Sequence, residues 1–397
     1  MNNSLVGKKL LVQGAGRGNL GLVKTAKSQG VFTIITGMGG NYPCTSLADV
    51  NCYADITDEE AVLKIAQKYN VDGAIICCSD TGLNAIGRCN DVMHLSGICE
   101  ESAIVASNKY LMKNALIEAG VRTAKFYQIH NKKELVSAVN DLGFPVIIKA
   151  TDLQGSRGIC IVRDEVNLFD AFNDVMSLTR KDFCIIEEFI EGVEFGAQSF
   201  VYNNEVLFVL PHGDETMMCK TAVPVGHYMP YQLSEELYRD TCVQVKNAIM
   251  ALKLNNCAVN VDLIIKDNLV YIIELTGRVG ANCLPELTGN YYGINYYDMI
   301  LCASLGENPL PVYEKRKTPC ATLARMIRSN TSGFIKKLTI PQMADVEIHM
   351  FVKESDEVRE FTNCNDAIGE VIVRGNTLND CEELMNKVLS ELRVELI

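Results

Sequence analysis

Two acidic residues interrupt an otherwise apolar stretch of this 397-residue chain. Asp262 and Glu274 lie in AVNVDLIIKDNLVYIIELTGR, which is predicted to form two strands joined by a turn at Asp267 and Asn268. A carboxylate on a buried strand is costly unless a partner compensates its charge. Two carboxylates about 4 Å apart repel by roughly 4 kcal/mol at an effective dielectric constant near 20. A shared cation relieves this repulsion, and strand carboxylates suit Mg²⁺, which normally arrives with a nucleotide phosphate.

The register of the two strands decides whether the acids can share a cation, because side chains alternate between the faces of a strand. A plain two-residue turn would place Asp262 opposite Ile273, and Glu274 would then face away. We therefore predict a longer loop, from Asp267 to Leu269, or a bulge that restores the pairing of Asp262 with Glu274.

Composition narrows the function classes. The formal net charge is −12 and no basic tract occurs, so nucleic acid is not an expected partner. None of the sixteen cysteines forms a C-x-x-C pair, and they are expected to be buried apolar residues in a reducing cytoplasm. The five histidines are dispersed without H-x-x-x-H spacing, so zinc is not expected. Neither a signal peptide nor an apolar run of membrane-spanning length is recognised, which predicts a soluble, cytoplasmic protein.

The first part of the chain alternates strands and helices, which predicts a parallel sheet covered by helices. Gly16, Gly18 and Gly21 fit the G-x-G-x-x-G spacing of a dinucleotide loop. The second strand, however, ends in Thr36-Gly37-Met38-Gly39 without the acid that binds the ribose, so NAD is disfavoured. The glycine loop and the loop Ser79–Gly82 are either ligand-binding loops at the carboxyl edge of the sheet or ordinary turns.

The middle of the chain contains two lysines and a glycine loop. Lys109 opens a helix in SNKYLM, and Lys149 ends a strand in VIIKA. The loop LQGSRGI follows between two strands, so it is not a Walker loop, which opens a helix. It is either a phosphate-covering loop or a hairpin. Residues 206–230, with Lys220, His212 and His227, are predicted to form a long loop or lid, and the tail from Ala321 a small α/β lobe.

In this order the features resemble the ATP-grasp superfamily: SNKYLM, VIIKA, LQGSRGI, the acidic hinge IIEEFIEGVEF, and the two strand acids. The tail IGEVIVRGNTLNDCEELMNKVL is similar to the C-terminal lobe of L-amino acid ligases. The resemblance implies an α/β fold with a Rossmann-like parallel-sheet front domain, an ATP-grasp fold and a small C-terminal α/β lobe. The implied divisions are 1–108, 109–194 with the glycine-rich loop, 195–320 with the magnesium site, and 321–397.

The resemblance also implies roles for individual residues. Lys109 and Lys149 would bind the phosphates of ATP, and the loop with Gly155, Ser156 and Gly158 would cover the β- and γ-phosphates. Glu187 and the backbone of Glu188 to Ile190 would bind the adenine, and Glu194 would bind the ribose. Asp262, Glu274 and Thr276 would bind Mg²⁺, although the family usually has asparagine where Thr276 stands. Arg278 would stabilise the transferring phosphoryl group, and Lys220 in the lid is the second candidate catalytic residue.

The implied reaction uses ATP and Mg²⁺ to convert a carboxylate into an acyl phosphate, which an amine then attacks, with release of ADP. Amino acids are the expected substrates, and a homodimer is the expected assembly. Two other functions stay open. One is a bicarbonate-activating enzyme similar to carboxylases or carbamoyl-phosphate synthases. The other is a nucleotide-binding regulatory protein without activity, for which Thr276 is the only indication.

Overall fold

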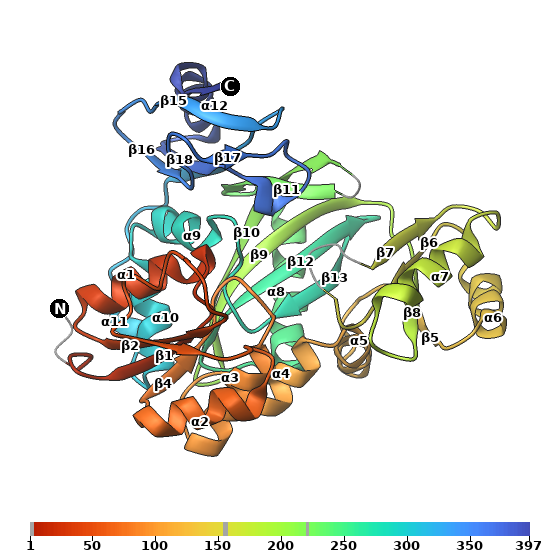
Figure 1. Ribbon diagram of the computed structural model, residues 1–397. Coiled ribbons are helices and arrows are strands. Elements are labelled where there is room, and N and C mark those ends of the chain that lie inside the picture. Colours follow the sequence, from red (N-terminus) through yellow and green to blue (C-terminus); the bar gives the residue numbers. More distant parts are fainter. Residues whose placement is uncertain (1–3, 154–157, 220–221) are drawn as a thin grey trace.

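The computed structural model describes residues 4–153, 158–219 and 222–397. Its first part is a four-stranded parallel sheet of order β3-β2-β1-β4. The strands are β1 (Lys9–Gln13), β2 (Phe32–Gly37), β3 (Val50–Tyr53) and β4 (Gly73–Ile75). Helices α1 (Leu20–Ser28) and α10 (Tyr296–Ser304) cover one face, and α2 (Glu59–Tyr69), α3 (Leu83–Met93) and α4 (Glu100–Ala106) lie on the other (Figure 1). The predicted parallel sheet is thus confirmed.

The glycine loop of this sheet is explained by close packing. It runs through the short helix η1 (Arg17–Asn19) into α1. A Cβ on Gly18 would lie 2.6 Å from the Cβ of Cys78, and one on Gly21 would lie 2.3 Å from the ring of Tyr297. Neither distance is sterically possible, so Gly18 lets η1 approach the segment after β4, and Gly21 lets α1 approach α10.

A second, smaller sheet has the order β5-β8-β6-β7 and lies apart from the front domain, to the right in Figure 1. Its strands are β5 (Phe126–Ile129), β6 (Val146–Lys149), β7 (Ile159–Val162) and β8 (Cys184–Glu188). Helices α6 (Lys132–Leu142) and α7 (Leu168–Leu178) pack on it through a shared apolar core. Helix α5 (Lys109–Glu118) connects the front domain to this sheet (Figure 1). Its first turn is capped by Asn108, whose side chain accepts hydrogen bonds from the backbone N–H groups of Tyr110 and Leu111.

The largest sheet is antiparallel and has the order β13-β12-β9-β10-β11-β14-β18-β16. Its strands are β9 (Val193–Tyr202), β10 (Glu205–Met218), β11 (Ala222–Met229), β12 (Cys257–Lys266), β13 (Leu269–Thr276), β14 (Ala321–Ile327), β16 (Val346–Met350) and β18 (Gly369–Gly375). The helices after β11 and β13 are α8 (Glu235–Ala251), α9 (Leu284–Tyr292) and α11 (Leu310–Tyr313). Because β11 pairs with β14, this one sheet continues from the middle of the chain into its last part.

The predicted bulge between the two acid-bearing strands is confirmed. Asp267 and Asn268 form a two-residue turn with φ values of 52° and 60°, as a type I′ turn requires. From that turn the strands pair regularly as far as Leu263 with Ile272, where the register shifts. The shift places Asp262 opposite Glu274, so both carboxylates project from the same face of the sheet.

The prediction of a lid at residues 206–230 is wrong for the part of this segment that the structure describes. It forms β10 and β11, which lie inside the large sheet between β9 and β14. The prolines suggested a loop, but Pro224 lies where the β10–β11 register shifts between Glu215 and Thr216. An irregular position of this kind tolerates a residue that lacks a backbone N–H.

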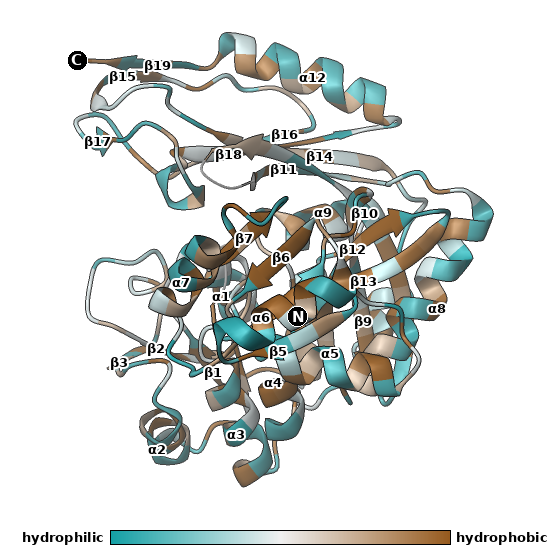
Figure 2. Ribbon diagram, turned by 90° about the vertical axis from the view of Figure 1, so that its right-hand side faces the viewer, coloured by the Kyte–Doolittle hydropathy of each residue, from teal (hydrophilic) through white to brown (hydrophobic). Residues whose placement is uncertain are grey.

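The last part of the chain adds a three-stranded sheet and a helix. The elements are β15 (Gly333–Thr339), β17 (Glu357–Val358), β19 (Arg393–Leu396), α12 (Leu378–Glu391) and the short helix η2 (Cys364–Asp366). Helix α12 alternates hydrophilic and hydrophobic turns in Figure 2, and its apolar side packs against β14 and β18. Among the described residues, no helix combines the length and apolar character needed to cross a membrane.

Candidate active site

The paired carboxylates of Asp262 and Glu274 form the centre of a polar strip on the large sheet. Solvent reaches Asp262, but the surrounding protein still desolvates its carboxyl group. This desolvation, together with the negative charges of Glu274 and Asp214, raises the pKa of Asp262 to about 7. The excess of negative charge favours a bound cation at this position.

Lys109 joins the start of α5 to this carboxylate pair. Its Nζ lies 3.2 Å from Oε1 of Glu274 and donates a hydrogen bond of 3.1 Å to the carbonyl of Leu153. Burial lowers the pKa of Lys109, but the nearby charges of Glu274 and Asp80 outweigh it and hold the pKa above its ordinary value. The ammonium group is therefore fixed between the acids and the residue that precedes the glycine loop.

Glu187 is a buried anion between two buried lysines. Its Oε2 accepts from Nζ of Lys149 at 3.0 Å and lies 3.2 Å from Nζ of Lys113. Burial raises the pKa of Glu187, but the two ammonium groups hold it below its ordinary value. The other carboxylate oxygen, Oε1, is buried and has no hydrogen-bond partner among the described residues. A buried acceptor without a partner is costly, so this oxygen is available to a donor on a ligand.

Lys113 was not among the predicted site residues. It is almost fully buried, with a side chain 2% exposed, and its Nζ also donates to Oγ1 of Thr123 at 2.9 Å. The signal in the sequence was its spacing from Lys109, because residues four apart lie on the same face of a helix. One face of α5 thus presents one lysine to Glu274 and one to Glu187.

Arg278 is held by an acid that the sequence analysis assigned only to a loop. Its Nε and Nη2 donate to the two carboxylate oxygens of Asp80 at 2.8 and 2.6 Å. The hydroxyl of Thr276 donates to Oδ1 of the same carboxylate at 2.6 Å. Burial raises the pKa of Asp80, but Arg278 and Thr276 lower it overall. The two-point contact fixes the plane of the guanidinium group at the junction of the front domain and the large sheet.

We expect the Asp80→Asn variant to lose part of the pH dependence of stability. The pKa of Asp80 is lower in the folded protein than its ordinary value of 3.8. The ionised Asp80 carboxylate therefore stabilises the folded state fully above pH 3.8, and this stabilisation is lost as the pH falls through the pKa of the folded protein. In that acidic range the unfolded chain binds up to one more proton, a slope of at most about 1.4 kcal/mol per pH unit. Urea unfolding of both proteins at several acidic pH values measures this slope. An unchanged slope in the variant would contradict the assigned role of Asp80.

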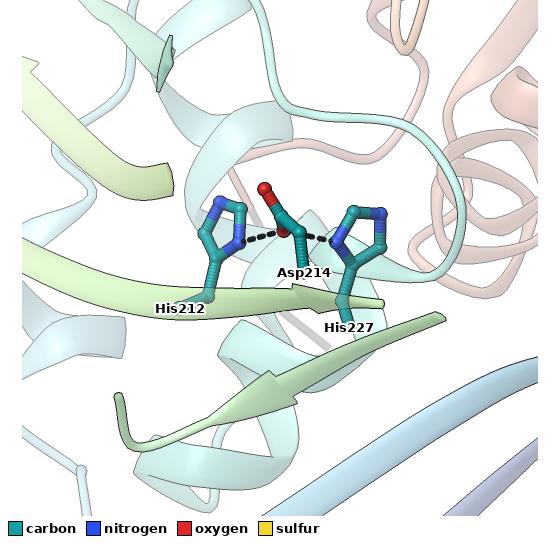
Figure 3. A group of neighbouring side chains, drawn as sticks. All are labelled: His212, Asp214 and His227. Atoms are coloured by element: carbon teal, nitrogen blue, oxygen red, sulfur yellow. Dashed lines mark hydrogen bonds and ion pairs between the residues drawn. The ribbon is translucent and has the colours of Figure 1, made fainter. Parts of the chain in front are cut away.

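Two histidines and an aspartate lie together on β10 and β11, a cluster that the sequence analysis missed (Figure 3). Nδ1 of His212 and Nδ1 of His227 lie 2.9 and 2.6 Å from Oδ1 of Asp214. The expectation that the histidines are dispersed is wrong for these two, because strand pairing places His227 directly opposite Asp214. No spacing rule along the chain could reveal this pairing, since it depends on the register of two strands.

The other predicted residues lie around these groups or outside the described residues. Glu188 ends β8, and its Oε1 accepts from the backbone N–H of Lys125 at 3.0 Å. Glu194 is exposed and pairs with Ile264, two positions from Asp262 and so on the same face. Ile190 lies in the half-buried segment between β8 and β9, and Gly158 adopts a φ of +64° after the loop. Gly155, Ser156 and Lys220 lie outside the described residues.

The donor set fits a nucleotide with its magnesium ion. Asp262 and Glu274 supply paired oxygen ligands, the type that Mg²⁺ prefers. Lys109, beside Glu274, and Lys149, beside Glu187, supply positive charge for phosphates. The free Oε1 of Glu187 can accept a hydrogen bond from an amino group such as that of adenine. Thr276 donates its hydroxyl proton to Asp80, which leaves the lone pairs of its oxygen for a cation.

Comparisons with known proteins show what the chain is similar to. Residues 107–251 match the ATP-grasp (A) domain of phosphoribosylglycinamide synthetase. The crystal structure of phosphoribosylglycinamide synthetase from Anaerococcus prevotii superposes with a TM-score of 0.88 and 48% sequence identity, over 98% of this chain and 100% of that one.

More distant relatives are also similar over nearly the whole length of the chain. A formate-dependent phosphoribosylglycinamide formyltransferase of Prochlorococcus marinus is 23% identical over 408 residues, covering 98% of each protein. The structure of an L-amino acid ligase from Bacillus licheniformis has a TM-score of 0.81 at 18% identity, over 99% of both chains, and therefore shares the fold. The similarity thus covers nearly the whole chain and not residues 107–251 alone.

Proposed function

Because the chain belongs to the ATP-grasp superfamily of carboxylate–amine ligases, we propose that it activates the carboxylate of an amino acid with ATP and joins it to an amine, releasing ADP and phosphate. The observation that carries this proposal is the convergence of the Asp262–Glu274 pair, Lys109 and Arg278 at one edge of the large sheet. The arrangement combines a cation site with fixed positive groups, and phosphoryl transfer needs little else from a protein.

The relatives support an amino acid as the activated acid. The protein from Anaerococcus prevotii is named for a glycinamide product, which contains the amide of an amino acid. The relative from Prochlorococcus marinus is named for its use of formate, which is also a carboxylic acid. A small carboxylate is therefore common to both names.

In the proposed reaction, Lys149 and Lys109 bind the phosphates of ATP, and Oε1 of Glu187 accepts from the adenine amino group. Asp262 and Glu274 would hold Mg²⁺, which would neutralise charge on the phosphates. Arg278, fixed by Asp80, stabilises the phosphoryl group during its transfer to the substrate carboxylate. The amine then attacks the acyl carbon, and the closed site must exclude water that would otherwise hydrolyse the acyl phosphate.

The same proposal includes the four divisions 1–108, 109–194, 195–320 and 321–397, with the ATP site between the second and the third. It also includes a homodimer and a cytoplasmic location. Light scattering of the purified protein measures the assembly, and a monomer at micromolar concentration would overturn that part.

A substrate panel tests the activity. We expect ADP and phosphate to form only when ATP and Mg²⁺ are mixed with one amino acid and a suitable amine, because the acyl phosphate must be captured to complete a cycle. Glycine and other small amino acids are the first acids to test, and mass spectrometry identifies the amide product. Hydroxylamine in place of the amine traps the acyl phosphate as a hydroxamate.

The alternatives give different products in the same assay. Formation of AMP and pyrophosphate would contradict the acyl-phosphate route. Release of ADP that depends on bicarbonate would favour a carboxylase-like enzyme. Tight ATP binding without any turnover across the panel would favour a regulatory protein.

A further inference from the structure

The His212–Asp214–His227 cluster has no role in the phosphoryl transfer described above. Its carboxylate can only accept hydrogen bonds, so both histidines must carry their proton on Nδ1, where each meets Oδ1 of Asp214 (Figure 3). This tautomer leaves the Nε2 atom of each ring with a lone pair. Only a lone pair without a hydrogen-bond partner can accept a proton from a substrate.

His212 has both ring nitrogens occupied. Its Nε2 lies 3.4 Å from Nε2 of Gln198, whose Oε1 accepts from the backbone N–H of Gly280 at 3.1 Å. The Gln198 amide is therefore oriented with its NH₂ group toward the ring, where it donates to the His212 lone pair. The residue is buried, and this burial lowers the pKa of His212. His212 is a neutral packing residue that holds Asp214 in place.

His227 differs because only one of its nitrogens is engaged. In the described part of the chain, Nδ1 bonds to Asp214 and Nε2 has no hydrogen-bond partner. An imidazole with Nδ1 fixed by a carboxylate and Nε2 unengaged is the usual arrangement of a histidine that accepts a proton. The carboxylate sets the tautomer and stabilises the imidazolium that forms.

Strand register places this histidine on the active face of the sheet. Asp262 on β12 pairs with Gly196 on β9, which pairs with His212 on β10. Asp214 is two residues further along β10 and pairs with His227. Paired residues, and residues two apart on a strand, project from the same face, so His227 shares the face of Asp262 and Glu274.

Gly196 provides the space between the two groups. A Cβ at this position would lie 2.1 Å from Cε1 of the His212 ring, so the histidine ring occupies the place of a missing side chain. The cluster therefore packs against β9, which lies between β10 and the strand that carries Asp262. The negative charge of Asp214 is one of the causes of the raised pKa of Asp262.

We propose that His227 is the base that removes a proton from the amine substrate, with Asp214 as its positioning residue; this inference rests on the proposed ligase function. An amine substrate is an ammonium ion at neutral pH and has no lone pair for attack. Nε2 of His227 takes one proton, and the freed nitrogen lone pair forms the bond to the acyl carbon. The bond from that carbon to the phosphate oxygen breaks, and the departing phosphate takes the electron pair and the second amine proton.

The test compares two nucleophiles in the full-length protein. Hydroxylamine is largely unprotonated at neutral pH and needs no base, whereas an amino-group acceptor does. We expect His227→Gln to lower amide formation by about 10²-fold or more while hydroxamate formation with hydroxylamine stays within a few-fold of wild type. The ratio of the two rates is the readout, because a structural defect would lower both rates together.

His212→Gln is the matched variant from the same cluster. We expect it to lower the ratio of amide to hydroxamate formation by much less than His227→Gln does, since His212 acts only through its contact with Asp214. An unchanged ratio in His227→Gln would overturn the proposal while leaving the ligase function intact. Stoichiometric zinc in the wild-type protein that is lost in His227→Gln would also overturn it, because the ring would then be a metal ligand. Absence of hydroxamate and amide in the wild type would instead contradict the ligase function itself.

Discussion

Replacement of Glu274 by glutamine is expected to lower kcat by at least about 10³-fold while the protein stays folded. The substitution keeps the size of the side chain but removes the charge that faces Asp262 and holds Lys109 at 3.2 Å. An amide oxygen is a weaker ligand for Mg²⁺ than a carboxylate, and phosphoryl transfer depends on that ion. ADP release with the best acid and amine pair measures the effect, and circular dichroism checks the fold.

The matched control is Glu205→Gln, which removes a carboxylate from an exposed position at the start of β10 on the same sheet. It should retain wild-type turnover. Retained activity in Glu274→Gln would contradict the assignment of Glu274 as a magnesium ligand. Raising the Mg²⁺ concentration should recover part of the lost rate if the defect is one of ion binding, whereas a purely structural defect would not respond.

The bulge between β12 and β13 shows how far sequence reasoning can reach. Asp262 and Glu274 can share a cation only if they face each other, but a regular two-residue turn at Asp267 and Asn268 would pair Asp262 with a different residue. A longer loop or a bulge could satisfy both, so the sequence predicted one of these two, and the structure contains the bulge. The order of strands in the large sheet could not, because it depends on contacts between distant segments, such as the pairing of β11 with β14.

The site residues divide in the same way. Lys109, Lys149 and Arg278 were proposed as site residues because their neighbours along the chain form recognisable motifs. Asp80 meets Arg278 only after the front domain packs on the large sheet, and His227 meets Asp214 only through strand pairing. Local signals therefore predicted the residues at the ends of elements, and long-range packing determined their partners.

Replacement of Glu187 by glutamine is expected to have the largest effect on stability, a loss of about 3–5 kcal/mol in the free energy of unfolding. Glu187 is the anion that faces both Lys113 and Lys149, and the side chains of Glu187 and Lys113 are 3% and 2% exposed. Removing the negative charge leaves two ammonium groups that repel each other in a poorly solvated space. Urea unfolding at neutral pH measures the loss.

Two further variants separate this charge effect from a general defect. Glu188→Gln removes the adjacent carboxylate, whose Oε1 accepts a backbone hydrogen bond that glutamine can also accept, and it should cost no more than about 1 kcal/mol. Adding Lys113→Met to Glu187→Gln removes one of the two uncompensated charges, so the double variant should be more stable than Glu187→Gln alone. If the double variant were instead less stable, packing of the Lys113 side chain would outweigh its charge, and the buried cluster would not depend on the electrostatic balance assigned to it.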